Sequence, residues 1–237
     1  MLGALTGVQE VNIAHLVLTN GIGCYAFSDR VLAAANPGSV SPETGFRDNG
    51  DNFLEAFVSI NTNLATWHSV RDMAAALRRL KPSLKSIDLQ QPSRDRIVVS
   101  LESDGRLLVF DLWQESEGFR RLLACLIALY QFPPKQTLVF DEPEKGIYPL
   151  GLSLLADEFK GFASKGRGQI LVTTHSPEFL NQFAPEQIRV VEMRNFVTQI
   201  GPVAPEQLEG LREHFLQPGE LLTVDEGRLE GSLVGAE

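Results

Sequence analysis

The amino-acid sequence predicts an α/β fold in which helices flank a largely parallel sheet. The first observation is the run LVFDEPE at 138–144, which is apolar and then acidic. The second is LVTTHSPEFL at 171–180, where an apolar run leads into a histidine. The third is the helical spacing of apolar residues at 150–164, between the two runs. Strand, helix and strand in this order are typical of parallel sheets with right-handed crossovers.

The composition is that of a globular protein. A chain of 237 residues is in the range of one large domain, or of one domain with a subdomain. Hydrophobic residues at 43% and charged residues at 22% exclude the disordered and fibrous classes. No apolar run approaches the roughly 18 residues of a membrane helix, and the amino end lacks a signal-peptide pattern. The net charge of −9 argues against a nucleic-acid surface. Cys24 and Cys125 form no metal-ligand pattern, and we expect a reducing, cytoplasmic location.

The N-terminal half is predicted to hold a helical and hairpin subdomain. Residues 1–35 show apolar alternation and a glycine turn at 21–23 without a start signal, so this segment is left unassigned. The domain is therefore expected to be incomplete at its N-terminal end. After a loop, apolar residues at three- and four-residue spacing predict a helix over 52–80. Two β-rich runs, 96–101 and 106–112, flank an Asp-Gly pair and predict a hairpin.

The remaining domain boundaries are predicted from the same sequence patterns. We expect a subdomain at 36–111, a core at 112–204 and a helical tail at 205–237. The elements expected in the core are helices at 117–130, 150–164 and 177–183 and strands at 137–140, 169–173, 188–192 and 196–200. In such sheets, ligands bind beyond the carboxyl ends of the strands.

Asp141 and Glu142 come directly after the strand at 137–140. A strand that ends in two carboxylates suits a Mg²⁺–triphosphate site, because Mg²⁺ prefers oxygen ligands and one carboxylate can hold it. The second carboxylate can polarise the attacking water. The plain alternative is a solvated strand end. His175 follows the next strand and could contact a γ-phosphate; alternatively, Ser176-Pro177 simply starts a helix there.

Ser116, Glu117 and Gly118 begin the predicted helix at 117–130. A hydroxyl and a glycine at a helix start present backbone N–H groups to a phosphate, and Arg120 and Arg121 add positive charge nearby. In the alternative reading, Ser116 only caps the helix. These residues leave the two interpretations open.

Three segments, taken in order, resemble the C-terminal half of an ABC-type ATPase head of the AAA subgroup related to SMC, RecF and overcoming-lysogenization-defect proteins. They are ESEGFRRLLACLIAL, TLVFDEPEKGIYP and GQILVTTHSPEFLNQF. The resemblance covers about 112–192 and implies a P-loop NTPase-like fold with ATP and Mg²⁺ as ligands. It also implies a head-to-tail dimer, homomeric or heteromeric, that sandwiches two nucleotides. Such heads serve in nucleic-acid-processing and defence complexes.

The resemblance assigns a role to each candidate residue. Ser116, Glu117 and Gly118 would form the signature motif, which reads the γ-phosphate of a nucleotide held by the partner. Asp141 would be the Walker B aspartate on Mg²⁺, and Glu142 the catalytic glutamate. Residues 145–149 would be the D-loop at the dimer interface, and His175 the switch histidine.

One part of the family pattern is missing. No G-x-x-x-x-G-K-[ST] phosphate loop, the Walker A motif, occurs in the 237 residues. Because phosphoryl transfer depends on positioning and charge stabilisation, this loop would have to come from sequence or a chain outside the one given. The alternative is a catalytically inactive interaction or regulatory module that keeps the ATPase fold.

Overall fold

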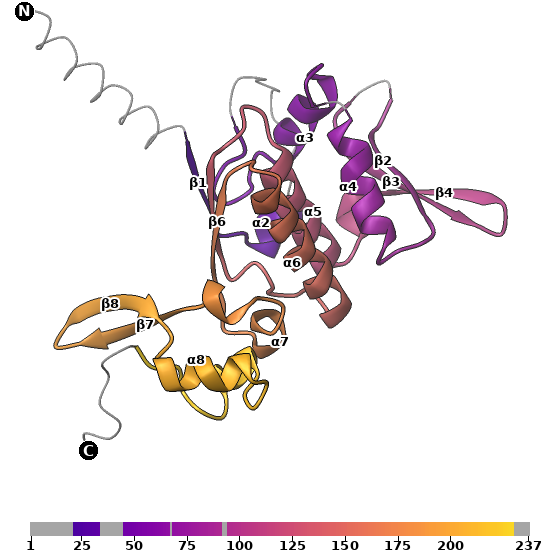
Figure 1. Cartoon of the computed structure of the whole chain (residues 1–237). Helices are drawn as coiled ribbons and strands as arrows, with labels where there is room; N and C mark the ends of the chain where they lie inside the picture. The colour runs from indigo at the N-terminus through magenta and orange to yellow at the C-terminus, as the bar shows by residue number, and fades with distance from the viewer. Residues whose placement is uncertain (1–20, 34–44, 67, 92–93, 230–237) are drawn as a thin grey trace, which may run out of the picture. The chain divides into compact units, whose positions relative to one another are not determined.

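The computed structural model describes residues 21–33, 45–66, 68–91 and 94–229. The chain divides into two compact units, Met1–Thr173 and Thr174–Glu237, each of which is described by itself. The four-part division expected from the sequence stays a prediction. Figure 1 labels the helices and strands. No described helix is both long and apolar enough to cross a membrane.

The first unit contains two sheets and five α-helices among its described residues. Its elements are β1 (Ile22–Tyr25), α2 (Asp29–Ala33), α3 (Phe53–Thr62), α4 (Ser69–Arg78), β2 (Leu84–Leu89), β3 (Ile97–Ser103), β4 (Arg106–Asp111), a 3-10 turn η1 (Leu112–Gln114), α5 (Glu117–Tyr130), β5 (Thr137–Asp141), α6 (Pro149–Ser164) and β6 (Gln169–Thr173).

The predicted parallel sheet has the strand order β1-β5-β6, and both strand pairs are parallel. Tyr25 pairs with Phe140, and Asp141 pairs with Thr173. The prediction of a turn at 21–23 was wrong, because β1 begins at Ile22. Gly23 is needed in this strand for space, since a Cβ there would come 2.5 Å from the Tyr25 hydroxyl.

One face of this sheet packs on helices. Leu138 and Phe140 are buried, and the Phe140 ring stacks on Phe159 of α6 with centroids 4.7 Å apart. Tyr25 lies 5.3 Å from the same ring. In Figure 1, α2, α5 and α6 lie on this side of the sheet. The apolar side of α5 is buried throughout, which is why the 3.6-residue periodicity predicted its bounds correctly.

The opposite face of the sheet carries exposed and half-buried side chains. Its residues alternate with the buried ones: Cys24 of β1 is exposed, Val139 of β5 is half-buried, and Leu171 of β6 is 50% exposed. No described strand pairs with the outer edge of β6. Parallel sheets normally have both faces covered, so this sheet lacks one layer within the described part of the unit.

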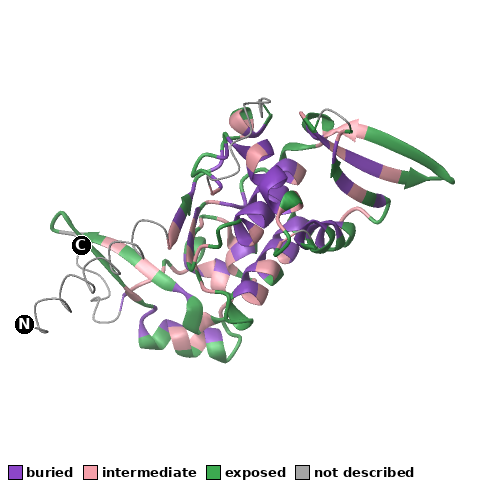
Figure 2. Cartoon of the chain, turned by 90° about the horizontal axis from the view of Figure 1, so that it is seen from above, coloured by how far each residue is buried: buried purple, intermediate pink, exposed green. Residues whose placement is uncertain are grey.

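The second sheet is antiparallel, with the order β2-β3-β4. The predicted hairpin is confirmed, and its turn residues Asp104 and Gly105 have φ angles of 51° and 72°. The single helix predicted over 52–80 was wrong, because α3 and α4 are separate. Asn63 ends α3 in an extended conformation, and its side chain accepts a hydrogen bond from the Ala65 N–H at 2.8 Å. Figure 2 shows purple, buried helices in this unit and the green, exposed β4 strand.

The second unit is small and has its own core. Its elements are α7 (Pro177–Leu180), η2 (Pro185–Gln187), β7 (Arg189–Arg194), β8 (Val197–Pro202), α8 (Pro205–Arg212) and η3 (Pro218–Leu222). Buried side chains of Ile188, Val203, Leu211 and Leu221 form the core. The strand expected at 188–192 is β7, which pairs with β8 in an antiparallel hairpin and not with the parallel sheet. A two-residue turn with positive φ at both positions makes this local pairing available.

Candidate functional site

Thr173, the last residue of β6, holds the Asp141 carboxylate and the Glu142 backbone at the end of β5. The Thr173 hydroxyl donates to Asp141 Oδ1 at 2.6 Å. The backbone N–H of Glu142 donates to the Thr173 carbonyl at 3.1 Å and to its hydroxyl oxygen at 3.2 Å. Sequence reasoning gave Thr173 no role, although its position opposite Asp141 in the predicted parallel register was a usable signal. One residue therefore orients the Asp141 side chain and the backbone of Glu142.

The chain leaves the strand sharply at Glu142, whose φ is 43°. This left-handed conformation is costly for a residue with a Cβ, and the hydrogen bonds to Thr173 stabilise it. The Glu142 carboxylate forms an ion pair with the ammonium of Lys145, three residues later. The hydrogen bond and the charge of Glu142 raise the pKa of Lys145, which is largely exposed.

The donor set at this position suits a magnesium ion only if the ion brings other ligands. Asp141 is exposed, and its Oδ2 accepts no hydrogen bond from the described residues. Those residues include no group of three or more His, Cys, Asp and Glu side chains that could hold a metal. Mg²⁺ commonly binds one or two carboxylates and takes its remaining ligands from water and substrate phosphates. The residues present fit that pattern.

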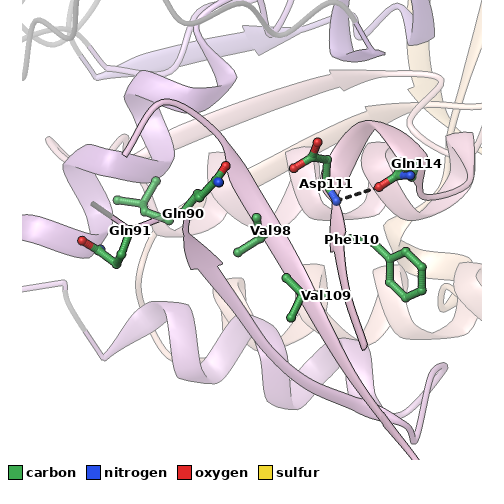
Figure 3. A pocket seen from close by; sticks show the side chains of 8 residues that line it. Gln90, Gln91, Val98, Val109, Phe110, Asp111 and Gln114 are labelled. Atoms are coloured by element: carbon green, nitrogen blue, oxygen red, sulfur yellow. Dashed lines mark hydrogen bonds between the residues drawn. The ribbon is translucent and has the colours of Figure 1, made fainter. Parts of the chain in front are cut away.

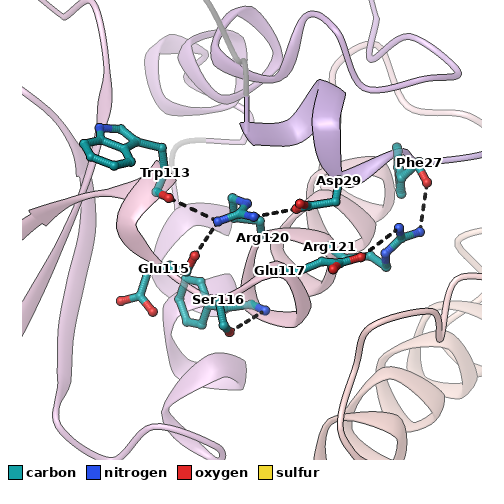
Figure 4. Close-up of polar contacts among 9 residues, drawn as sticks. Phe27, Asp29, Trp113, Glu115, Ser116, Glu117, Arg120 and Arg121 are labelled. Carbon is teal, nitrogen blue, oxygen red and sulfur yellow. Dashed lines mark hydrogen bonds and ion pairs between the residues drawn. The ribbon is translucent and has the colours of Figure 1, made fainter.

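The start of α5 carries the three other predicted residues, of which Figure 4 labels Ser116 and Glu117. Ser116 is exposed, and its hydroxyl accepts a hydrogen bond from the Phe119 N–H at 3.3 Å, so the capping interpretation is confirmed. Glu117 is exposed and pairs with Arg121 at 3.6 Å. Gly118 is buried. Capping does not exclude phosphate binding, because the remaining N–H groups of the first turn stay available.

The helix start packs directly on the loop that follows β5. A Cβ added to Gly118 would lie 2.5 Å from the Gly146 carbonyl oxygen and 3.2 Å from the Ile147 Cα. In return, a Cβ on Gly146, whose φ is 74°, would meet the Glu117 carboxylate at 2.8 Å. The structure therefore brings together two segments that the sequence gave as separate motifs, the one at 116–118 and the one at 145–149.

Arg120 and Arg121 do not offer their charge to a phosphate, contrary to the sequence-based interpretation. Both are buried. Arg120 pairs with Asp29 of α2 at 2.5 Å and donates to the carbonyls of Trp113 and Glu115 (Figure 4). Arg121 donates to the Phe27 carbonyl at 2.9 Å. A buried guanidinium needs such partners, so these side chains tie α5 to the segment at 27–29.

His175 is an exposed residue of the second unit. It follows Thr173 by two positions in the chain, but its placement at the carboxylates of the first unit stays a prediction. Beside it, the Ser176 hydroxyl accepts a hydrogen bond from the Phe179 N–H at 3.2 Å and caps α7. The expectation that Ser176-Pro177 starts a helix is confirmed.

A cavity of about 390 Å³ lies elsewhere, on the antiparallel sheet (Figure 3). Its lining residues come from β2, β3, β4 and the segments beside them: Leu89, Gln90, Gln91, Val98, Val109, Phe110, Asp111 and Gln114. The predicted site residues are not among them. The cavity is thus separate from the acidic strand end.

Comparison with solved structures finds similarity to SMC heads. The Smc head bound to the C-winged helix domain of ScpA gives a TM-score of 0.50 at 17% identity, over 79% of this chain and 56% of that chain. A structure from work on ATP-driven dimerization and DNA-stimulated activation of SMC ATPases gives a TM-score of 0.48 at 18% identity. The match covers 63% of this chain and 91% of that chain. The Smc head with coiled coil and joint from Pyrococcus yayanosii gives a TM-score of 0.46 at 18% identity. The match covers 63% of this chain and 29% of that chain. The chain thus spans little more than half of the first of these and under a third of the last. No curated protein matches the chain.

The family assignment comes from the sequence match. Residues 45–181, more than half of the chain, match the family described as "AAA domain, putative AbiEii toxin, Type IV TA system". This range includes the helix start at 116–118, the acidic strand end and His175. The predicted fold class, a P-loop NTPase-like α/β fold, is confirmed by the likeness to the SMC head. The chain belongs to this AAA domain family and is a nucleotide-binding module of the ABC/AAA ATPase type.

Proposed function

We propose that the chain is the distal part of an ABC-type ATPase head that binds ATP with Mg²⁺ and hydrolyses it at an interface between subunits. The observation that carries this proposal is the acidic strand end, where Thr173 orients Asp141 and positions the backbone of Glu142. A strand that merely ended in solvent would not need this arrangement of hydrogen bonds.

Each acidic residue has a separate task in the proposed reaction. Asp141 would hold Mg²⁺, which neutralises charge on the phosphates when bound. Glu142 is the general base that accepts a proton from the attacking water. Its ion pair with Lys145 has to open or lengthen for this, since the carboxylate oxygen that accepts the proton has to reach the water. His175 is assigned to the γ-phosphate, as the family pattern implies.

The second half of the site is the face formed by the start of α5 and the loop after β5. Ser116 and Glu117 are exposed at the helix start, where the N–H groups and the helix dipole favour an anion. Gly118 lets this helix start lie directly on Gly146. A nucleotide held by the partner subunit would contact this face. The proposal therefore requires two subunits for each completed site.

The test supplies the missing phosphate loop. The full chain is mixed with a second polypeptide that carries a G-x-x-x-x-G-K-[ST] loop, and phosphate release is measured with and without Mg²⁺. We expect Mg²⁺-dependent turnover that falls about 10²-fold or more in Glu142→Gln, which removes the base and keeps its size. The control polypeptide has alanine in place of the loop lysine. Equal turnover in wild type and Glu142→Gln would overturn the proposal.

A second candidate function is a non-catalytic interaction module. Two observations favour it: the 237 residues contain no phosphate loop, and Glu142 is engaged by Lys145. This function predicts stable folding and partner binding that do not respond to Glu142→Gln. A longer lifetime of an ATP-bound assembly in that variant would contradict it.

A further inference from the structure

The cavity on the antiparallel β2-β3-β4 sheet has the size and the floor of a small-molecule site. Its volume of about 390 Å³ falls within the range of about 300–1,000 Å³ that is usual for such sites. Val98 and Val109 form the floor and lie on one face of the sheet, because Val109 pairs with Ser100 and side chains alternate along a strand. Val98 is half-buried and Val109 is 55% exposed. This flat apolar surface suits one face of a planar ring.

The amide groups at the cavity leave hydrogen bonds for a ligand. The Oε1 atom of Gln90 is buried and has no hydrogen-bond partner among the described residues. Because burying an acceptor without a donor is unfavourable, this oxygen indicates a donor that the folded chain does not supply. The Oε1 atom of Gln114 accepts a hydrogen bond from the Asp111 N–H at 2.9 Å (Figure 3). Its NH₂ group is therefore directed elsewhere and can donate to a ligand.

The charge of the cavity excludes a phosphate. Among its eight lining residues, Asp111 carries the one charged side chain. Its Oδ2 atom accepts hydrogen bonds from Arg96 and from the Trp113 indole, both at 3.1 Å. A carboxylate offers about four acceptor positions, so it can accept a further hydrogen bond. The cavity thus favours a neutral ligand with N–H donors over an anion.

A purine base has this combination of properties. It is a planar ring with donors and acceptors along its edge. A glutamine amide recognises adenine through two hydrogen bonds, to the exocyclic amine and to a ring nitrogen. The apolar floor at Val98 and Val109 can cover the face of the ring, while Gln90 binds its edge.

The cavity adjoins the proposed phosphate-binding face in the chain. Gln114 lines the cavity and ends η1, and Ser116 follows two positions later. Their Cα atoms are at most about 7 Å apart. The start of α5 favours an anion, whereas the cavity favours a neutral ring. The two ends of one nucleotide differ in the same way.

We propose that this cavity binds the purine base of the nucleotide whose phosphates face the start of α5. The ring lies on Val98 and Val109, and its edge hydrogen-bonds with Gln90. Asp111 and Gln114 provide a further acceptor and a further donor. This inference rests on the proposed function, because it names the groups that hold the base of the ATP.

Photolabelling of the full chain locates the base directly. The probe is an azido derivative of adenosine, which has no phosphates and so needs neither Mg²⁺ nor a second polypeptide. After illumination, the labelled peptides are identified by mass spectrometry. We expect label in the segments 89–91 and 109–114. Excess adenosine should reduce this label about tenfold, and uridine or ribose should not.

Variants of the lining residues test the contacts. Gln90→Leu removes the amide at similar size and should reduce the labelling about tenfold. Val109→Asp should reduce it as well, because it places a charge under the ring. Gln199→Leu is the matched control: it makes the same change at an exposed residue of β8 in the second unit and should keep the label. Circular dichroism and urea unfolding show that each variant is folded.

Turnover in the mixture with a phosphate-loop polypeptide separates the two proposals. Gln90→Leu should raise the KM for ATP more than it lowers kcat, because the base contact is the same in the ground state and the transition state. Labelling of the cavity without any turnover would count against the proposed function alone. Turnover with a KM that Gln90→Leu leaves unchanged would count against the base site alone.

Three labelling results would overturn the base site. One is label outside the segments 89–91 and 109–114. Another is equal competition by uridine and adenosine, since the site would then not select a purine. The third is undiminished labelling of a folded Gln90→Leu variant.

Discussion

Replacing Gly118 by alanine tests the contact between the helix start and the loop after β5. The added Cβ would lie 2.5 Å from a backbone carbonyl oxygen and 3.2 Å from a backbone Cα, so neither neighbour can move away by rotating a side chain. Overpacking of this kind costs typically about 1–3 kcal/mol. Alanine gains up to about 1 kcal/mol over glycine in a helix. The net expectation is a destabilisation of about 0–3 kcal/mol.

Gly161→Ala is the matched control. Gly161 lies inside α6, and a Cβ there meets nothing within 4 Å, so the helix gain of about 0.5–1 kcal/mol should appear in full. The two variants should thus differ by about 1–3 kcal/mol in the free energy of unfolding. Urea unfolding followed by tryptophan fluorescence measures this difference, because both tryptophans belong to the first unit. Equal stabilisation by both substitutions would refute the contact.

Two more predictions concern the acidic strand end and the core. Thr173→Val should raise the Mg²⁺ concentration needed for turnover and lower the rate about tenfold, because a hydrogen bond to a charged group contributes about 1.5–3 kcal/mol. Thr173→Ser keeps the hydroxyl and should retain most of the activity. A serine variant as impaired as the valine variant would contradict the role of the hydroxyl. Burial raises the pKa of Tyr25 to about 12, so its stabilising contribution is complete below the unfolded pKa of about 10 and is lost as the pH rises toward 12. This loss is on the order of 2–3 kcal/mol, and urea unfolding between pH 9 and 11 should show a steeper fall for wild type than for Tyr25→Phe.

The sequence predicted elements that carry strong local signals. The bounds of α5 and β6 were correct because apolar periodicity or a short apolar run stands between clear end signals, such as Ser116 at the start of α5. The β3–β4 hairpin followed from its Asp-Gly turn. Asp141 and Glu142 were placed at a strand end because an apolar run leads directly into them.

Features that depend on distant partners were not predictable in this way. β1 contains a glycine that argues against a strand, and its pairing with β5 joins residues more than one hundred positions apart. The sequence suggested exposed charge at Arg120 and Arg121, because their partners at 27–29 lie more than ninety positions away in the chain. The packing of Gly118 on Gly146 has no local signal either, since each glycine alone is compatible with a simple turn or helix start.

The aromatic cluster sets a practical limit on how this protein can be divided. The rings of Tyr25, Phe27 and Phe46 lie within 5.8 Å of one another, and Tyr25 also meets Phe140. The family match begins at residue 45, so a fragment cut to that boundary would lose two of these rings and one edge of the sheet. A fragment that keeps the aromatic cluster and β1 therefore has to start upstream of the point at which the family match begins.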